Sequence, residues 1–194
     1  MNLPFKLTSQ EHRTTDQKID RALVDLLAEH VKHTTLVGCA MITIVGAGLW
    51  LSFPVTQVLG WVLVGYLVAI PRLMIIQRTV NSLSPDHSRS TLEWTIGLIL
   101  FISGLHWGAA GWLFLDTNNV QHFALVCGAI LGVIASSLAM FSTRPLISCL
   151  FAYTVLGIVA VKLATEGNWG LSVMCLVALL GYTVASKVLG RRIE

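Results

Sequence analysis

The feature that most constrains this chain is a long run of residues, 34–71, that contains no Asp, Glu, Lys or Arg. The run is too long for one membrane-crossing helix, because about 20 residues span a hydrocarbon core of about 30 Å. Its one interruption is Ser52-Phe53-Pro54, which predicts two helices joined by a tight turn. We place these helices at about 34–53 and 55–76, with Pro54 initiating the second because a residue in a first helical turn needs no N–H donor.

Four more apolar spans follow in the same pattern, at about 92–115, 120–142, 145–165 and 169–189. The segments between them are polar and contain turn-forming residues. Charged residues make up 12% of the 194 residues, against about 25% in an average soluble domain. The mean hydropathy is +0.74. We therefore predict an all-α polytopic membrane protein with six transmembrane helices over residues 34–190. This composition excludes a soluble enzyme, a disulfide-bonded secreted domain and a nucleic-acid-binding protein.

The distribution of basic residues predicts the orientation, because Lys and Arg are retained on the cytoplasmic side of a membrane. With six spans both termini share one side, and twelve of the 13 Lys and Arg residues fall on that side, leaving only Lys162 on the other. We expect a multi-pass protein of the bacterial inner membrane with both termini in the cytoplasm. Arginines at the inner boundary are expected to anchor the helices by extending toward lipid headgroups, namely Arg72, Arg78, Arg144, Arg191 and Arg192.

The N-terminal segment is polar and is expected to lie outside the bilayer. Residues 1–15 predict a flexible N-terminus, and the absence of an apolar core in residues 1–18 predicts no cleavable signal peptide. Residues 16–33 place Leu23, Leu27 and Val31 on one helical stripe with charged residues largely elsewhere. That pattern indicates an amphipathic helix on the cytoplasmic leaflet, with a disordered tail as the alternative.

The segment SGLHWGAAGW, residues 103–112, is the main candidate for a functional site. His106 lies within the third span, where an imidazole is costly unless it has a partner or faces a cavity. Tryptophan prefers the headgroup level of a bilayer, and all but one of the 6 tryptophans map to the outer half of their helices. We therefore predict a small pocket open to the outside in which His106 meets a ligand, with a wall formed by Ser103, Trp50, Trp61, Trp107 and Trp112.

Two other interpretations of His106 stay open. In the first, it is a packed residue, hydrogen-bonded to the backbone or a hydroxyl of a neighbouring helix, for example Ser136 or Thr154. In the second, His106 and His122 form a haem or metal site. Depth argues against the second, because a rise of about 1.5 Å per residue puts His106 well below the external turn. We therefore predict no metal site, and the sequence identifies no cofactor.

Small residues recur at helical spacing in the third and fourth spans. Such residues let helix backbones approach closely where lipid provides no hydrophobic driving force for association. We predict helix packing along Gly104, Gly108, Gly111, Gly128, Gly132 and Ser136, with a dimerisation face as the alternative. Lys162 and Glu166 are spaced to form an i,i+4 ion pair. The 4 cysteines lie in apolar segments without ligand or disulfide spacing and are expected to be packing residues.

The layout as a whole resembles a known family. A basic amphipathic lead-in, the segment RLMIIQR, the segment HWGAAGWLF and a small-residue fourth helix followed by STRP are similar to the MASE-like six-helix sensor modules at the N-termini of bacterial diguanylate cyclases and sensor histidine kinases. The likeness covers about residues 16–192. It implies a homodimeric module that regulates a cytoplasmic output domain, with residues 191–194 as the start of the linker. The chain contains no GGDEF or histidine-kinase sequence and no MHYT-like motif.

We therefore expect a sensory and dimerisation module that perceives a ligand or membrane state and controls cyclic di-GMP synthesis or a two-component pathway. Its expected partners are the lipid bilayer, a second copy of the chain, an output domain and a small amphipathic ligand, with no nucleic acid. A small inner-membrane transporter or channel is the alternative, which paired charges or broken helices in the spans would favour. An enzyme is not expected in this segment, because His106, Ser103 and Ser136 form no recognised catalytic motif.

Overall fold

The computed structural model describes residue 29 and residues 32–82, 88–140 and 145–191. Over these residues the chain forms six helices and no strand, as the apolar spans predict. The N-terminal helix covers Lys32–Leu49. It is followed by α2 (Val55–Ser82), α3 (Ser88–Phe114), α4 (Val120–Met140), α5 (Pro145–Thr165) and α6 (Trp169–Arg191). The predictions for residues 1–15, most of 16–33 and 192–194 lie outside the described residues.

Five of the described helices are long and apolar enough to cross a membrane, which are the N-terminal helix, α2, α3, α4 and α6. The described apolar part of α5, Cys149–Thr165, is shorter. The prediction of a loop over residues 77–91 is wrong at both ends, because α2 continues to Ser82 and α3 already begins at Ser88. Residues 77–84 contain no glycine or proline, so polar residues extend the helix beyond the apolar span.

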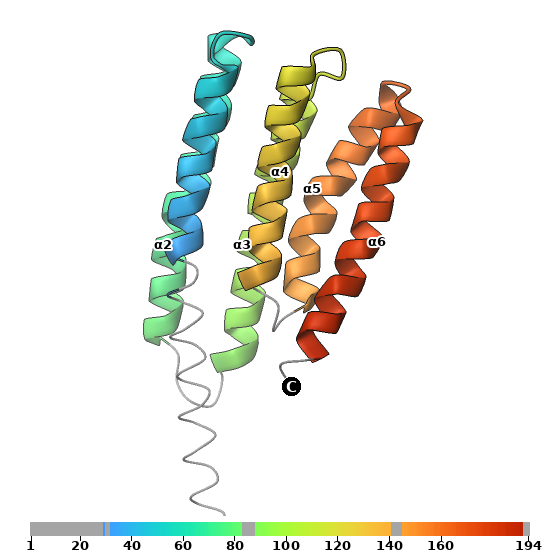
Figure 1. Ribbon diagram of the computed structural model, residues 1–194. Helices are drawn as coiled ribbons and strands as arrows, with labels where there is room; N and C mark the ends of the chain where they lie inside the picture. The colour runs from blue at the N-terminus through green and yellow to red at the C-terminus, as the bar shows by residue number, and fades with distance from the viewer. Residues whose placement is uncertain (1–28, 30–31, 83–87, 141–144, 192–194) are drawn as a thin grey trace, which may run out of the picture.

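The helices lie along a common direction, and short turns join them at one end of the bundle (Figure 1). We call this the turn end; the opposite end, where α6 finishes, is the terminal end. At the predicted Pro54 turn, Gln57 and Val58 donate backbone hydrogen bonds to the Pro54 carbonyl, at 2.9 and 3.1 Å. Pro54 is therefore the residue that caps α2, one position before its first turn. Gly167, with a φ of 79°, ends α5 in the left-handed conformation that glycine adopts without strain.

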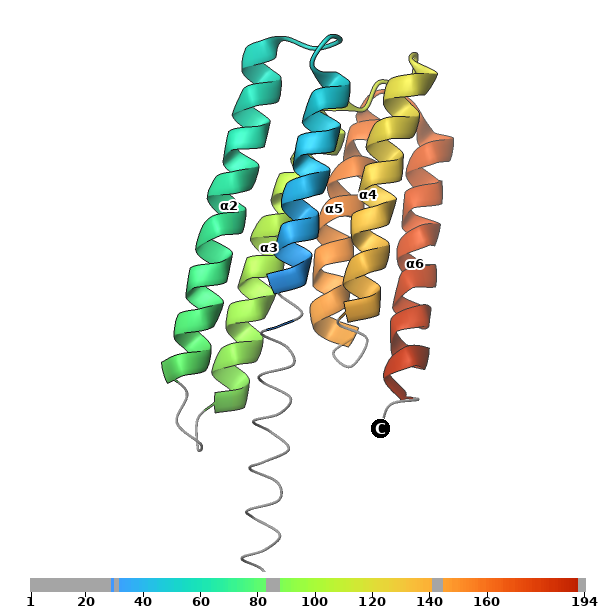
Figure 2. The same cartoon turned by 60° about the vertical axis from the view of Figure 1, so that its left-hand side comes forward.

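The helices pack in two rows, with α3 and α5 at the centre. Each helix in the series α2, α3, α5 and α6 contacts the next, and α4 packs on α3 and α5. The N-terminal helix lies between α2 and α4 (Figures 1 and 2). Its Thr43 hydroxyl is 2.6 Å from that of Tyr66 on α2, and its Gly48 lies against Leu125 of α4.

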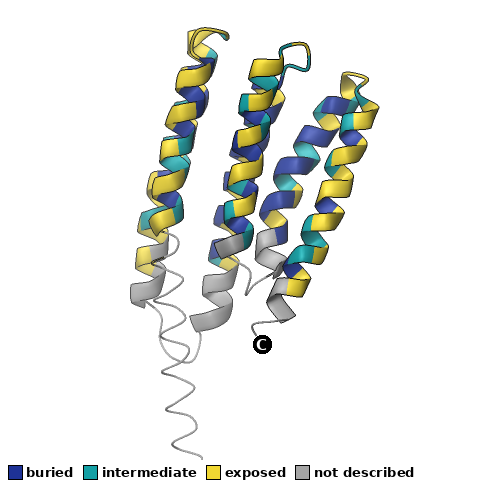
Figure 3. Ribbon diagram, viewed as in Figure 1, coloured by how far each residue is buried: buried dark blue, intermediate teal, exposed yellow. Residues whose placement is uncertain are grey.

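Large apolar residues lie on the outside of the bundle as well as in its core. Figure 3 shows exposed residues along the outer faces of the helices and buried residues between them. Leu67 and Leu180 are 70% and 66% exposed, while Phe114, Val126 and Val155 are buried. Helices that are apolar all round are typical of segments in contact with lipid. The structure therefore agrees with a protein that lies in a lipid bilayer.

The predicted glycine packing is confirmed on α3, but its partner is α5. A Cβ atom added to Gly104 would lie 2.9 Å from Thr154 Cβ, and one added to Gly108 would lie 2.5 Å from Ile158 Cδ1. Gly111 meets Val159 of α5 in the same way. The prediction that the α4 glycines pack within the fold is wrong, because Gly128 and Gly132 face open space. Side chains of α5 occupy the space beside the small residues of α3.

Candidate functional site

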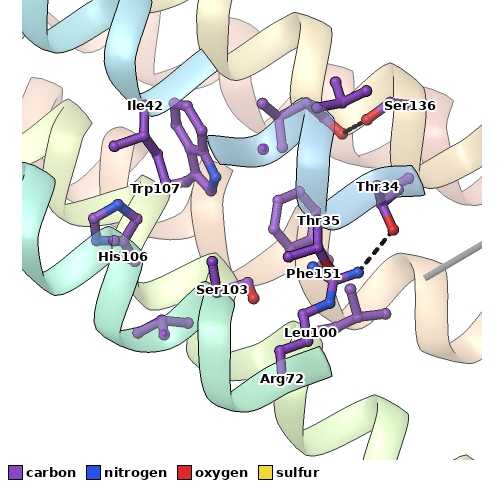
Figure 4. A pocket seen from close by; sticks show the side chains of 17 residues that line it. Thr34, Thr35, Ile42, Arg72, Leu100, Ser103, His106, Trp107, Ser136 and Phe151 are labelled. Atoms are coloured by element: carbon purple, nitrogen blue, oxygen red, sulfur yellow. Dashed lines mark hydrogen bonds between the residues drawn. The ribbon is translucent and has the colours of Figure 1, made fainter. Parts of the chain in front are cut away.

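A cavity lies inside the bundle between the N-terminal helix, α2, α3 and α4, with Phe151 of α5 at its side (Figure 4). It runs from His106, near the middle of α3, to Arg72 and Thr34, which lie nearer the terminal end. About 60 Å³ is available to the centres of water-sized molecules, and one water needs about 10–15 Å³ by that measure. The cavity therefore accommodates a few waters or one small ligand group.

The lining combines polar and apolar side chains, and none of its described residues is Asp or Glu. The polar lining residues are Thr34, Thr35, Arg72, Ser103, His106, Ser136 and Ser137. Apolar residues, including Ile42, Val68, Leu100, Val133 and Phe151, supply much of the rest. A few polar groups in a mostly apolar concave site are typical of small-molecule pockets.

Arg72 points into this cavity, which differs from the predicted headgroup anchor. Its Nη2 donates a hydrogen bond of 3.0 Å to Thr34 Oγ1 of the N-terminal helix. Its Nε is buried and has no hydrogen-bond partner. The difference arises because α2 continues to Ser82, so Arg72 lies within the helix, on the face that meets the N-terminal helix.

The other predicted anchors are on or beyond the helix ends. Arg78 is exposed, one and a half turns after Arg72, and its headgroup contact stays a prediction. Arg191 is the last residue of α6, and its side chain is outside the described residues. Arg144 and Arg192 are also outside the described residues.

His106 is buried against two tryptophans. Its ring stacks on that of Trp61 of α2, with centroids 4.8 Å apart and planes 10° apart. The ring centroids of His106 and Trp107 are 6.1 Å apart in an edge-to-face arrangement, and Trp61 Nε1 donates to the His106 backbone carbonyl at 3.2 Å. His106 Nε2 is buried without a hydrogen-bond partner, and it lies 2.7 Å from where a Cβ on Gly65 would be. Gly65 thus makes room for the imidazole, a role that the sequence analysis missed.

The predicted hydrogen bond from His106 to Ser136 or Thr154 is wrong. Ser136 Oγ donates to the Val133 carbonyl at 2.8 Å, and Thr154 Oγ1 donates to the Leu150 carbonyl at 2.8 Å, each within its own helix. Serine and threonine hydroxyls often bond back to the preceding helical turn in this way. Ser103, which lines the cavity as predicted, does the same with the Ile99 carbonyl.

The cavity does not open toward the turn end, where the sequence predicts it. Phe53, Trp61 and Phe114 fill that region as an aromatic cluster, with Phe53 and Phe114 centroids 5.2 Å apart and Trp61 and Phe114 centroids 5.8 Å apart. Trp50 and Trp112 are 43% and 44% exposed and do not line the cavity. Edge-to-face aromatic pairs pack well at these distances, so rings expected to border a pocket fill the space instead.

Lys162 forms the predicted ion pair with Glu166, with Nζ and Oε1 2.7 Å apart. Lys162 Nζ also lies 5.6 Å from the centre of the Trp112 ring. Trp112 therefore contributes to the turn end as a cation–π partner.

Within the described part of the chain, no three His, Cys, Asp or Glu residues are grouped as metal ligands. His122 lies beside the Phe53 ring, with centroids 5.3 Å apart. Cys149 is buried with its Sγ 3.2 Å from Ser186 Oγ.

One residue of the cavity wall connects directly to α6. Ser137 Oγ donates to the Ile134 carbonyl at 2.8 Å and lies 2.9 Å from the Tyr182 hydroxyl of α6. One residue further along α6, Thr183 Oγ1 is 2.7 Å from the Tyr153 hydroxyl of α5. These contacts were not predicted from the sequence, although Tyr182 and Thr183 are polar residues in an otherwise apolar sixth span.

Comparison of the chain with models of protein families, with curated proteins and with solved structures gave no match. The class of the protein therefore follows from its own architecture. It is a helical bundle with membrane-length apolar helices and an internal cavity lined by both polar and apolar residues.

Proposed function

We propose that this chain is a membrane-embedded sensory module in which a ligand in the cavity changes the position of α6. In this proposal α6 passes the change to a cytoplasmic signalling domain at its C-terminal end, a diguanylate cyclase or a histidine kinase. The observation that carries the proposal is the contact between Ser137, in the cavity wall, and Tyr182 of α6. A ligand that displaces Ser137 acts on α6 through one hydrogen bond.

Such a module functions as a switch only if the ligand binds two arrangements of the helices with different affinity. The polar contacts of α6 support this requirement, because the hydroxyl pairs that join it to α4 and α5 are individually weak. Interhelical hydrogen bonds in membranes average about 0.6 kcal/mol. The resemblance to MASE-like modules supports the same proposal, since those modules precede output domains.

A small transporter is the second candidate, because Arg72 and His106 bring two ionisable side chains into one cavity between the helices. Alternating access requires a site that reaches both faces of the membrane in turn. The packed cluster of Phe53, Trp61 and Phe114 closes the route from the cavity to the turn end. A transporter would need this cluster to open in a second arrangement, which the sensor does not require.

The proposal requires that the C-terminal end of α6 lie in the cytoplasm, with six spans and α5 among them. Alkaline phosphatase is expected to be inactive when fused after Glu194 and active when inserted at Thr117 in the turn before α4. A fluorescent protein fused after Glu194 should be bright. A C-terminal fusion with strong phosphatase activity would contradict both the orientation and the sensor.

A homodimer is part of the proposed module, and we place its interface on α4. Ala124, Gly128 and Gly132 are exposed at four-residue spacing, and Cβ atoms added to the two glycines meet nothing within 4 Å. Small residues at this spacing let two helices approach closely in lipid.

Replacing Gly128 and Gly132 together by leucine should abolish crosslinked dimers in membranes and leave the fold of the monomer intact. Gly60→Leu on α2 is the matched control, because Gly60 is also exposed with open space around it. Crosslinking of the double variant at the wild-type level would show that the dimer, if present, uses another surface.

A further inference from the structure

We infer that the cavity binds an anionic group of phosphate or carboxylate type, and that Arg72 is its charged ligand. The inference rests on the proposed function, because it names the chemical class of molecule that the sensor perceives. Its evidence is the charge, the hydrogen bonding and the space around Arg72.

Among the residues that the structure describes, no acidic side chain lines the cavity to balance the guanidinium charge. An arginine stays protonated in proteins, and ionisable groups within membrane spans pair with one another or face a water-filled cavity. The described lining residues include Arg72 and His106 but no Asp or Glu. Arg72 is half-buried and lies within the apolar segment Val55–Ile75 of α2. An anion in the cavity supplies the missing opposite charge.

The hydrogen-bonding capacity of Arg72 is also unfilled. Nη2 donates to Thr34, whereas Nε is buried and has no partner. The guanidinium presents its donors as a planar fork that matches the oxygens of phosphate and carboxylate. The hydroxyls of Ser103 and Ser136 line the same cavity and at present donate to carbonyls of their own helices. They are additional donors for an anion, because bonds to a charged acceptor are about twice as strong as neutral ones.

The volume of the cavity fits a small charged group, and a gap at one side leaves room for a chain attached to that group. About 60 Å³ is open to the centres of water-sized molecules, which suits one headgroup and excludes a large ligand. On the side where the N-terminal helix and α4 line it, the cavity has a gap to the surface, since Val37 and Gly38 are lining residues, Val37 is 56% exposed and a Cβ added to Gly38 meets nothing within 4 Å. Nearer the turn end the same two helices are tightly packed at Gly48 and Leu125.

Two sources supply such an anion. A lipid or fatty acid enters sideways through the gap and keeps its chain in the bilayer, whereas a soluble anion such as phosphate enters from the terminal end. Both use Arg72 for the same charged group, so the choice between them is made by experiment.

The test is a thermal unfolding titration of the purified full chain in dodecyl maltoside. The added compounds are decyl phosphate below its micellar concentration, inorganic phosphate, and decyltrimethylammonium as the amphiphile of opposite charge. Wild-type protein is expected to gain about 5 °C or more in Tm at saturation with a phosphate compound, and nothing from the cation. Stabilisation by decyl phosphate alone identifies a lipid source, and stabilisation by inorganic phosphate identifies a soluble one.

The variant Arg72→Gln should weaken the apparent affinity for that compound by about tenfold or more, because hydrogen bonds to charged groups are lost. Arg78→Gln is the matched control, since it removes an exposed arginine from the same helix, and it should bind as wild type does. If Arg72→Gln does not fold, Arg72→Lys decides the matter, because it keeps the charge but loses the fork and should bind about threefold or more weaker.

The inference is overturned if neither phosphate compound stabilises the wild type, or if the folded Arg72 variant binds as tightly as the wild type. These measurements use the chain without an output domain, so they separate the anion site from the sensor. Anion binding through Arg72 in a protein whose attached output domain never responds would refute the proposed function alone. A responsive output domain with wild-type behaviour in Arg72→Gln would refute the anion site alone.

Discussion

Replacing Gly104 by alanine should lower the free energy of unfolding by about 1–3 kcal/mol, the usual cost of overfilling a packed interface. The added Cβ would lie 2.9 Å from Thr154 Cβ and 3.2 Å from the Phe151 carbonyl oxygen. The carbonyl belongs to the backbone of α5, so the clash is relieved only if α3 and α5 move apart. Leucine at this position should prevent assembly of the bundle.

The measurement is reversible unfolding in mixed micelles with increasing SDS, followed by helix content. Gly97→Ala is the matched control, because Gly97 lies two helical turns earlier on α3 and a Cβ there meets nothing within 4 Å. Gly97 is buried but has room for a methyl group, and alanine has a helix propensity about 1 kcal/mol better than glycine, so the control should be neutral or slightly stabilising. Equal behaviour of the two variants would show that the α3–α5 interface does not hold the fold together.

Gly108 provides an intermediate case on the same interface. Its nearest neighbour is Ile158 Cδ1, the end of a flexible side chain, at 2.5 Å, although Ile158 Cβ follows at 3.1 Å. A side-chain tip moves more easily than a backbone carbonyl, so Gly108→Ala should cost less than Gly104→Ala.

The helices themselves were predictable because apolar length and turn residues determine where a membrane helix begins and ends. Pro54 and the Asp116–Asn119 turn mark boundaries that agree with the structure. Asn119 accepts backbone hydrogen bonds from Gln121 and His122 through its side chain, as a residue before a helix commonly does. The composition also predicts a membrane protein, because too few residues are charged to form a water-exposed surface.

The direction in which each helix faces was not predictable in the same way. In a soluble helix the polar side marks the surface, but here both the lipid face and the core face are apolar. Glycine spacing on α3 therefore predicted close packing without identifying α5 as the partner. Arg72 shows the same limit, because the basic-residue rule assigns a side of the membrane and says nothing about a side chain that turns inward to Thr34.

The position of the cavity was mispredicted for a related reason. Tryptophan preference gives the depth of a ring in the bilayer, and Trp61 and Trp112 share a similar depth. Only tertiary packing shows that Trp61 stacks on His106 while Trp112 meets Lys162 at the surface. The contact between Ser137 and Tyr182 joins residues far apart in the chain, so the polar residues of the sixth span do not identify their partners.

Replacing His106 by leucine should abolish the response of the sensor while leaving the amount of folded protein close to the wild-type level. The imidazole Nε2 has no hydrogen-bond partner that the substitution would orphan, and Trp61 donates to the backbone carbonyl of residue 106, which remains. Leucine keeps an apolar contact with the Trp61 ring. The polarity that the imidazole brings to the cavity wall is lost.

The response is measured with the full chain joined after Glu194 to a diguanylate cyclase catalytic domain, as cyclic di-GMP synthesis in vesicles before and after addition of decyl phosphate. Trp112→Leu is the matched control, because Trp112 was predicted in the pocket but lies outside the cavity lining and is exposed. It should respond normally. Tyr182→Phe should bind decyl phosphate with unchanged affinity and respond weakly, because its hydrogen bond to Ser137 is removed and Tyr182 does not line the cavity.

These three variants separate ligand recognition from transmission. Loss of response in His106→Leu together with normal folding assigns the histidine to recognition, whereas loss in Tyr182→Phe with intact binding assigns the Ser137 contact to transmission. If His106 only fills space between α2 and α3, its replacement by an apolar residue of similar size changes the packing by less than about 1.5 kcal/mol, and the response stays normal. A His106→Leu protein that responds like the wild type over the whole range of decyl phosphate would therefore remove His106 from the site and leave Arg72 as its only charged determinant.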